Sequence, residues 1–248
     1  MASSYGPLSL WYDTLTGDIP YGEFADFYEA RFGFDGGEFK TLLDLCCGTG
    51  TLTALMARRG YEMIAVDASA DMLMQASGKA SDAEIVPLYL CQDACELDLY
   101  GTVDGAVCCL DSLNHITDYS AFCTAISKVS LFLEKDRLFI FDVNTVFKHT
   151  HILADNTYVI DRDDVYCVWQ NETDPETLET DILLDFFIRD GNAYRRSGEE
   201  FSERAYSDRQ IDEAIISAGL EKVAVYADMT LSPPTDETER AIYVARKI

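Results

Sequence analysis

The stretch LLDLCCGTG, residues Leu42–Gly50, decides the fold because it joins an apolar run to a turn that contains two glycines. Three interpretations are open at this point. The stretch is a buried strand that leads into a ligand-binding turn, a pair of metal-ligating thiols, or a core strand followed by an ordinary tight turn. The flanking sequence distinguishes between them.

Short apolar runs alternate with helical patterns from residue 40 to about residue 145, which is typical of parallel strands buried between helices. We expect one more helix at 207–219 and two closing strands at 220–228 and 238–247. The predicted fold is α/β, a Rossmann-like doubly wound seven-stranded sheet with an antiparallel β insertion after strand five. Its five leading strands are expected at residues 40–47, 61–67, 84–93, 101–112 and 136–144.

Three parts of the chain follow from this pattern. Residues 1–35, rich in Tyr and Phe, are expected to form an N-terminal helical cover. Residues 157–206 alternate in polarity between turn signals and are expected to form the antiparallel insertion, a lid or substrate subdomain. Residues 36–156 and 207–248 form the core. Arg204 and Tyr206 are expected to take part in strand pairing at the surface of the insertion, and contact with a substrate carboxylate or sugar is the alternative.

The composition excludes some partners. The chain has 248 residues, 19 Lys and Arg against 44 Asp and Glu, and a net charge of −25. This charge argues against a nucleic acid or an anionic membrane as the partner, because both require clustered basic residues. We expect no signal peptide, reduced cysteines, a cytoplasmic location, and a monomer or homodimer.

Chemistry-bearing residues follow the predicted strands. Ligands of open parallel sheets bind beyond the carboxyl ends of the strands. Gly48 and Gly50 lie where the backbone must approach an anionic group. Asp67 is placed to accept hydrogen bonds from ribose hydroxyls, and Asp93 to reach a purine edge. Asp44, inside the strand, needs a polar or charged partner, and a ligand ammonium group would serve.

Two other kinds of site are less well supported. A dinucleotide-binding turn requires Gly or Ala at the position of Thr53, which argues against a nicotinamide-dependent oxidoreductase. Adjacent residues of a strand face opposite ways, so the cysteine pairs at 46–47 and 108–109 cannot all converge on one ligand. The sequence therefore predicts no metal site.

The same segments resemble the class I S-adenosylmethionine-dependent methyltransferases. LLDLCCGTG resembles the first motif of that family, with Cys46 in place of its first Gly, and VDASADML at 66–73 resembles the second. CQDACELDL at 91–99 and VDGAVCCLDSLNHI at 103–116 resemble the third and fourth. The antiparallel insertion resembles the subgroup of sugar N,N-dimethyltransferases and glycine N-methyltransferase-like enzymes.

The resemblance implies S-adenosyl-L-methionine as cofactor and methyl transfer to an amine or hydroxyl of a small molecule. A non-catalytic binder of S-adenosylmethionine or S-adenosylhomocysteine is the alternative. His115 and Tyr12 are the expected catalytic residues. His115 is preferred over His149 and His151, although a lone histidine can also be structural. The expected cofactor-binding residues are Tyr12, Tyr21, Asp44, Cys46, Gly48, Gly50, Asp67, Ala68, Met72, Asp93, Ala94, Leu110 and Asp111.

Overall fold

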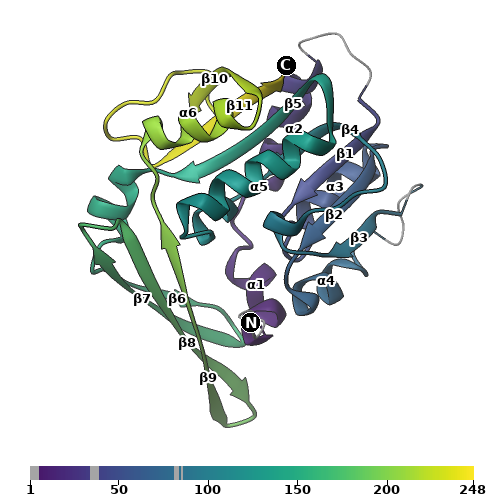
Figure 1. Ribbon diagram of the computed structural model, residues 1–248. Coiled ribbons are helices and arrows are strands. Elements are labelled where there is room, and N and C mark those ends of the chain that lie inside the picture. The colour runs from purple at the N-terminus through teal and green to yellow at the C-terminus, as the bar shows by residue number, and fades with distance from the viewer. Residues whose placement is uncertain (1–5, 34–38, 81–83, 85) are drawn as a thin grey trace.

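The computed structural model describes residues 6–33, 39–80, 84 and 86–248. Its centre is a seven-stranded sheet in the order β10-β11-β5-β4-β1-β2-β3 (Figure 1). The pairs from β5 to β3 are parallel, whereas β11 runs antiparallel to β5 and β10. This confirms the predicted doubly wound sheet. The strands are β1 (Thr41–Leu45), β2 (Glu62–Asp67), β3 (Leu88–Cys91), β4 (Val103–Cys108), β5 (Leu133–Asn144), β10 (Leu220–Ala227) and β11 (Arg240–Lys247).

Helices cover both faces of this sheet, because successive residues of its strands point to opposite sides. Phe139 of β5 packs in one core cluster with residues of α5 and α6, and the next residue, Ile140, packs in another with residues of α2 and α3. Figure 1 shows α5 and α6 on the near side. The helices are α2 (Tyr21–Phe32), α3 (Thr51–Arg58), α4 (Ala70–Ala76), α5 (Tyr119–Phe132) and α6 (Asp208–Ser217).

A second, four-stranded antiparallel sheet follows β5, as predicted, in the order β6-β7-β8-β9. Its strands are β6 (Thr157–Asp161), β7 (Val165–Asp174), β8 (Glu179–Asp190) and β9 (Ala193–Arg204). The first helix, α1 (Gly6–Leu15), packs on this sheet, with Leu8 and Leu15 in one cluster with Val165 and Phe186. The expected helical cover is thus represented by α1 and α2, whereas residues 1–5 and 34–35 of it lie outside the described residues.

Within the part of the chain that the structure describes, the short helical segments are η2 (Ala94–Glu96), η3 (Ser112–His115) and η4 (Lys148–Leu153). One expectation for the insertion was wrong. Tyr206 is not at the surface but is buried, with its ring against Phe122 of α5, and its hydroxyl donates to the carbonyl of Ile116. Tyr206 therefore packs against aromatic side chains of α5 and does not pair with a strand at the surface.

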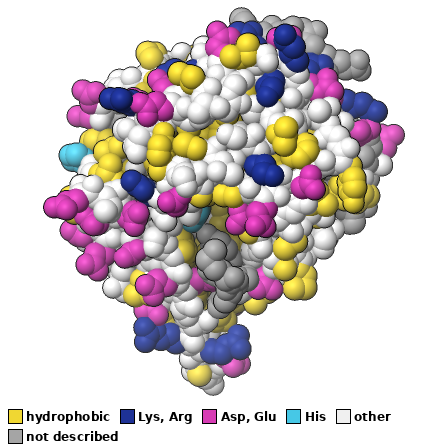
Figure 2. Space-filling model, in the orientation of Figure 1, with side chains coloured by type: hydrophobic (Ala, Val, Ile, Leu, Met, Phe, Trp, Pro, Cys, Tyr) yellow, Lys and Arg dark blue, Asp and Glu magenta, His cyan; other side chains and the backbone are white. Residues whose placement is uncertain are grey.

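Acidic side chains are spread over the face shown in Figure 2, with basic ones between them. Among the described residues, every helix is too short or too polar to cross a membrane.

Candidate active site

The turn after β1 is built on left-handed backbone. Cys46, Gly48 and Gly50 have φ values of 57°, 54° and 69°. A Cβ atom on Gly48 would meet no atom within 4 Å, whereas one on Gly50 would lie 2.7 Å from the Cβ of Ala76. Gly48 therefore leaves open space where a ligand can approach the backbone, and Gly50 is required by packing against α4. Cys46 adopts the conformation that the glycine of the resembling motif would favour.

Asp67, at the end of β2, ties this turn to the next helix. Its Oδ2 accepts a hydrogen bond of 2.8 Å from the backbone N–H of Gly48, and its Oδ1 accepts one of 2.8 Å from that of Ser69. Burial raises the pKa of Asp67 above its ordinary value. Each carboxylate oxygen accepts more than one hydrogen bond, so the fixed carboxylate has capacity for ribose hydroxyls.

Asp44 is a carboxylate in the interior of β1, with 2% of its surface exposed. Its partner is the buried hydroxyl of Thr53, which donates to Oδ2. Burial raises the pKa of Asp44 to about 7. Within the described part of the chain no Lys or Arg forms an ion pair with it, so a ligand ammonium group fits this position.

Four more of the expected cofactor-binding residues, Ala68, Met72, Asp93 and Ala94, follow β2 and β3. Ala68 and Asp93 are exposed there, and Oδ1 of Asp93 accepts a hydrogen bond of 2.8 Å from the backbone N–H of Cys95 at the start of η2. Ala94 is buried beside them. Met72 is buried in the cluster that joins α1 to the antiparallel sheet. Ala68, Asp93 and Ala94 thus lie together at the carboxyl ends of β2 and β3.

The turn after β4 holds two consecutive non-glycine residues in the left-handed region, Leu110 (φ 59°) and Asp111 (φ 50°). Such backbone persists only when its surroundings fix it. Both backbone N–H groups donate hydrogen bonds of 2.8 Å to the carboxylate of the buried Asp142. Arg240 in turn pairs with Asp142 and lies 3.1 Å from Oδ1 of Asp111. Burial raises the pKa of Asp142, and Arg240 opposes this effect.

The sequence analysis missed both Asp142 and Arg240. The signal for Asp142 was available: like Asp44, it is an acidic residue inside an otherwise apolar strand. Arg240 gave no such signal, because its partners are far away in the sequence. Asp142 lies 98 residues before it, and Asp111 lies farther still.

A cavity of about 390 Å³ adjoins this turn. Four of the predicted residues line it, namely Tyr12, Leu110, Asp111 and His115. Tyr21 is not among the lining residues, but it lies beside the hydroxyl of Tyr12. The remaining walls come mainly from α1, η4 and the antiparallel sheet, together with Asn144 of β5 and Arg240 of β11, so the cavity lies between the two sheets. Its other lining residues include Leu8, Asn144, Lys148, Cys167, Trp169, Phe201, Glu203 and Arg240.

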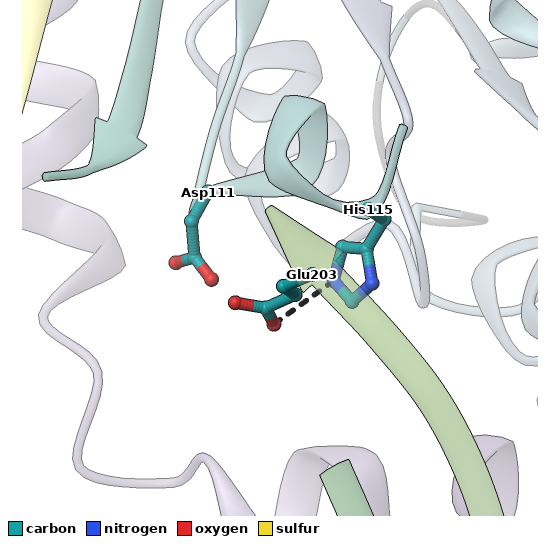
Figure 3. A group of neighbouring side chains, drawn as sticks. All are labelled: Asp111, His115 and Glu203. Carbon is teal, nitrogen blue, oxygen red and sulfur yellow. Dashed lines mark ion pairs between the residues drawn. The ribbon is translucent and has the colours of Figure 1, made fainter. Parts of the chain in front are cut away.

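A cluster of titratable groups lies at one wall of the cavity (Figure 3). Nε2 of His115 is 3.5 Å from Oε1 of Glu203, and Nε2 of His149 is 3.9 Å from Oε2 of the same carboxylate. Burial, with a contribution from Asp111, raises the pKa of Glu203 to about 8. Burial lowers the pKa of His115, and lowers that of His149 to about 4. Burial also raises the pKa of Asp111, but Arg240 and then other cations outweigh it, and the net shift is downward.

Glu203 and His149 are the other members of the site that sequence reasoning did not select. Glu203 lies 88 residues after His115 and comes from the last strand of the insertion. His149 was passed over in favour of His115 because it lies in a connecting helix. Neither residue lies at a regular spacing from the segment at 103–116, so the sequence does not indicate that they are close to His115.

Among the described residues, the group of side chains that could hold a metal ion contains no cysteine. All eight cysteines are unpaired, and Cys108 and Cys109 are buried. A hydrogen-bonding contact with Cys46, then burial, raises the pKa of Cys108, and burial raises that of Cys109, so both thiols stay protonated. Of the three interpretations of residues 42–50, the buried strand that leads into a ligand-binding turn agrees with the geometry.

Comparison with known proteins supports the methyltransferase resemblance. Residues 42–131 match the family described as Methyltransferase domain. The methyltransferase-family protein YqeM of Bacillus subtilis (strain 168) is 30% identical over 237 residues, which covers 95% of this chain and 94% of YqeM.

Two solved structures extend the comparison. An S-adenosylmethionine-dependent methyltransferase from Clostridium acetobutylicum ATCC 824 is 31% identical, with a TM-score of 0.89 over 98% of both chains. The S-adenosylmethionine-bound amino pentose methyltransferase CalS10 from Micromonospora echinaspora shares the fold, at 17% identity, a TM-score of 0.78, and coverage of 96% of this chain and 97% of its own. The chain therefore belongs to the S-adenosylmethionine-dependent methyltransferase family.

Proposed function

We propose that this enzyme transfers the methyl group of S-adenosylmethionine to an amine or hydroxyl group of a small molecule. The observation that carries the proposal is the cavity of about 390 Å³ at the end of β4. It is of a size that suits a small ligand, and Tyr12, Leu110, Asp111 and His115 line it. The fold likeness to the amino pentose methyltransferase CalS10 supports an acceptor of this size.

The residues around β1 and β2 would hold the cofactor. Gly48 leaves space for the backbone to approach it, Asp67 would accept hydrogen bonds from the ribose, and Asp44 would face the ammonium group. The rim at Ala68, Asp93 and Ala94 would surround the adenine. We keep Cys46, Met72 and Leu110 as further members of this site.

S-adenosylmethionine supplies a methyl group bonded to a positive sulfonium, and the protein contributes alignment and exclusion of water. Tyr12 and Tyr21 would cover the sulfonium, whose charge favours aromatic faces. His115 would contact the acceptor, and Tyr12 lines the same cavity. A bound acceptor in this cavity would be partly shielded from bulk solvent by the residues of α1 and the antiparallel sheet.

The remaining features support a small-molecule enzyme of the cytoplasm. The net charge of −25 disfavours nucleic acid and anionic membranes as partners. The eight unpaired cysteines agree with a reducing compartment. We propose a monomer or homodimer in which residues 157–206 act as the lid over the acceptor.

Isothermal titration with S-adenosylhomocysteine and S-adenosylmethionine tests the proposal. We expect a single site that binds both, and turnover on a panel of amines and hydroxyl compounds that releases S-adenosylhomocysteine. No binding of either compound at submillimolar concentration would refute it. Binding without turnover on any member of the panel would favour the non-catalytic binder instead.

A further inference from the structure

The cluster at the cavity wall contains the donor set of a metal site. Asp111, His115 and Glu203 each offer one ligand atom, and these atoms all lie within 4.8 Å of one another. Asp111 directly precedes η3, His115 is its last residue, and Glu203 comes from β9; Figure 3 shows the carboxylate of Glu203 between the other two side chains. Two ligands of one tetrahedral ion with bonds of about 2.1 Å lie roughly 3.4 Å apart. The distance of 3.5 Å between Nε2 of His115 and Oε1 of Glu203 is close to this value.

His149 provides a second, independent observation. Its side chain is completely buried, and its Nδ1 is 2.8 Å from Oγ1 of Thr180. Among the described residues its Nε2 has no hydrogen-bond partner, and it faces Oε2 of Glu203 at 3.9 Å, too far for a hydrogen bond. Metal-binding histidines have this arrangement, with one ring nitrogen fixed by a hydrogen bond and the other directed at the ion.

Glu203 also has few partners for a buried carboxylate. Its side chain is 6% exposed, and Nδ2 of Asn144 donates a hydrogen bond of 3.5 Å to its Oε2. A buried charge is costly unless it is paired. A cation between Glu203 and the two histidines would satisfy the carboxylate and the orphaned nitrogen of His149 together.

We propose that Asp111, His115 and Glu203, with His149 as a fourth donor, bind one divalent first-row transition-metal ion. Two imidazole nitrogens and two carboxylates suit Zn²⁺, Mn²⁺, Fe²⁺ or Co²⁺, whereas Mg²⁺ and Ca²⁺ favour all-oxygen sites. The ion would lie at the wall of the acceptor cavity. If the proposed function holds, an acceptor hydroxyl would coordinate the ion there and lose its proton more readily.

Two cations beside the site limit its affinity. Arg240 lies 3.1 Å from one oxygen of Asp111, although it is also paired with Asp142. Nζ of Lys148 donates a hydrogen bond of 2.8 Å to Oδ1 of Asn144, which adjoins Glu203. Because Lys148 opposes a dication, Lys148→Met should tighten metal binding.

Co²⁺ titration of the chelator-treated protein tests the proposal. We expect saturable d–d absorption in the visible range with one ion per chain, and competition by Zn²⁺. Thiolate ligation to any of the eight cysteines would add strong near-ultraviolet charge-transfer bands, which this nitrogen and oxygen site lacks. Glu203→Gln and His149→Gln should weaken binding at least about tenfold. The matched controls are Glu200→Gln, an exposed residue of β9, and His151→Gln, the third histidine of the chain.

Circular dichroism and a thermal melt establish whether each variant is folded. If the buried substitutions unfold the protein, His115→Gln decides, because its side chain is 30% exposed. A Co²⁺ signal that is absent, that the controls reduce as much, or that is purely thiolate in character would overturn the metal site. In that case the buried carboxyl of Glu203 is neutralised by a proton and not by a metal ion. Retained S-adenosylhomocysteine binding would show that this failure leaves the proposed function standing.

Discussion

The hydroxyl of Thr53 donates a hydrogen bond to the carboxylate of Asp44, and both side chains are buried next to the turn that follows β1. Thr53 is the residue that distinguishes this turn from a dinucleotide-binding one. The hydrogen bond from its hydroxyl lowers the pKa of Asp44, but burial has the larger effect and raises this pKa to about 7. The protonation state of Asp44 is therefore open to change near neutral pH.

The first prediction concerns cofactor affinity. Asp44 attracts a ligand ammonium group only when it is ionised, so S-adenosylhomocysteine should bind more tightly as the pH rises through about 7. Isothermal titration between about pH 6 and 8 measures this dependence. Asp44→Asn should bind more weakly and with little dependence on pH. An equal slope in the wild type and this variant would show that another group is responsible.

The same carboxyl predicts how stability changes with pH. Its pKa is about 7 in the folded protein and about 3.9 in the unfolded chain. Between these values only the folded state holds the proton, so the free energy of unfolding of the ligand-free protein decreases as pH rises from the unfolded to the folded pKa and is constant above it. Urea unfolding at several pH values should show a loss of up to about 4 kcal/mol from this group. Asp44→Asn should flatten that part of the curve.

Gly48 and Gly50 should respond differently to the same substitution. Gly48→Ala adds a methyl group to open space and costs about 1–2 kcal/mol for the left-handed backbone, but it should obstruct the cofactor. Gly50→Ala carries the same backbone cost and a clash with Ala76, about 2–4 kcal/mol in all. Chemical denaturation and titration with S-adenosylhomocysteine separate the two effects. A Gly48→Ala variant with normal affinity would remove the assigned role of this position.

Asp67 should contribute directly to cofactor affinity. Asp67→Ala removes the expected charge-assisted hydrogen bonds to the ribose and should weaken S-adenosylhomocysteine binding by about 1–3 kcal/mol. It also removes the two backbone contacts to Gly48 and Ser69. Thermal unfolding of the variant without ligand reports that second effect. Unchanged affinity in a folded variant contradicts the ribose assignment.

Arg240 should be more important for stability than its position near the chain end suggests. Arg240→Leu leaves the buried Asp142 without its cation, which should cost about 3–5 kcal/mol in the free energy of unfolding. Arg246→Leu is a suitable control, because Arg246 pairs with the exposed Glu221 of the neighbouring strand at 3.4 Å. We expect that control to change stability by about 1 kcal/mol or less.

The fold was predictable from the sequence because its strands are short apolar runs that end at glycines and acidic residues. The turn after β1 and the carboxylate of Asp67 follow from that local pattern. The residues around the cavity were less predictable, because they are brought together only when the antiparallel sheet packs on the central sheet. His115 and Glu203 are 88 residues apart, and no local periodicity connects them. Tyr206 was misplaced for the same reason, since its aromatic partners, Tyr119 and Phe122, both lie on α5 of the central domain.

The cavity between the two sheets takes its walls largely from α1 and the antiparallel sheet, whereas the turn at Gly48 and Asp67 belongs to the central sheet alone. Under the proposed function, many residues that would contact the methyl acceptor thus come from other stretches of the gene than Gly48 and Asp67, whereas Tyr12, Leu110 and Asp111 would border both compounds. A mutant library confined to residues 157–206 would vary the walls of the cavity and leave Gly48 and Asp67 unchanged.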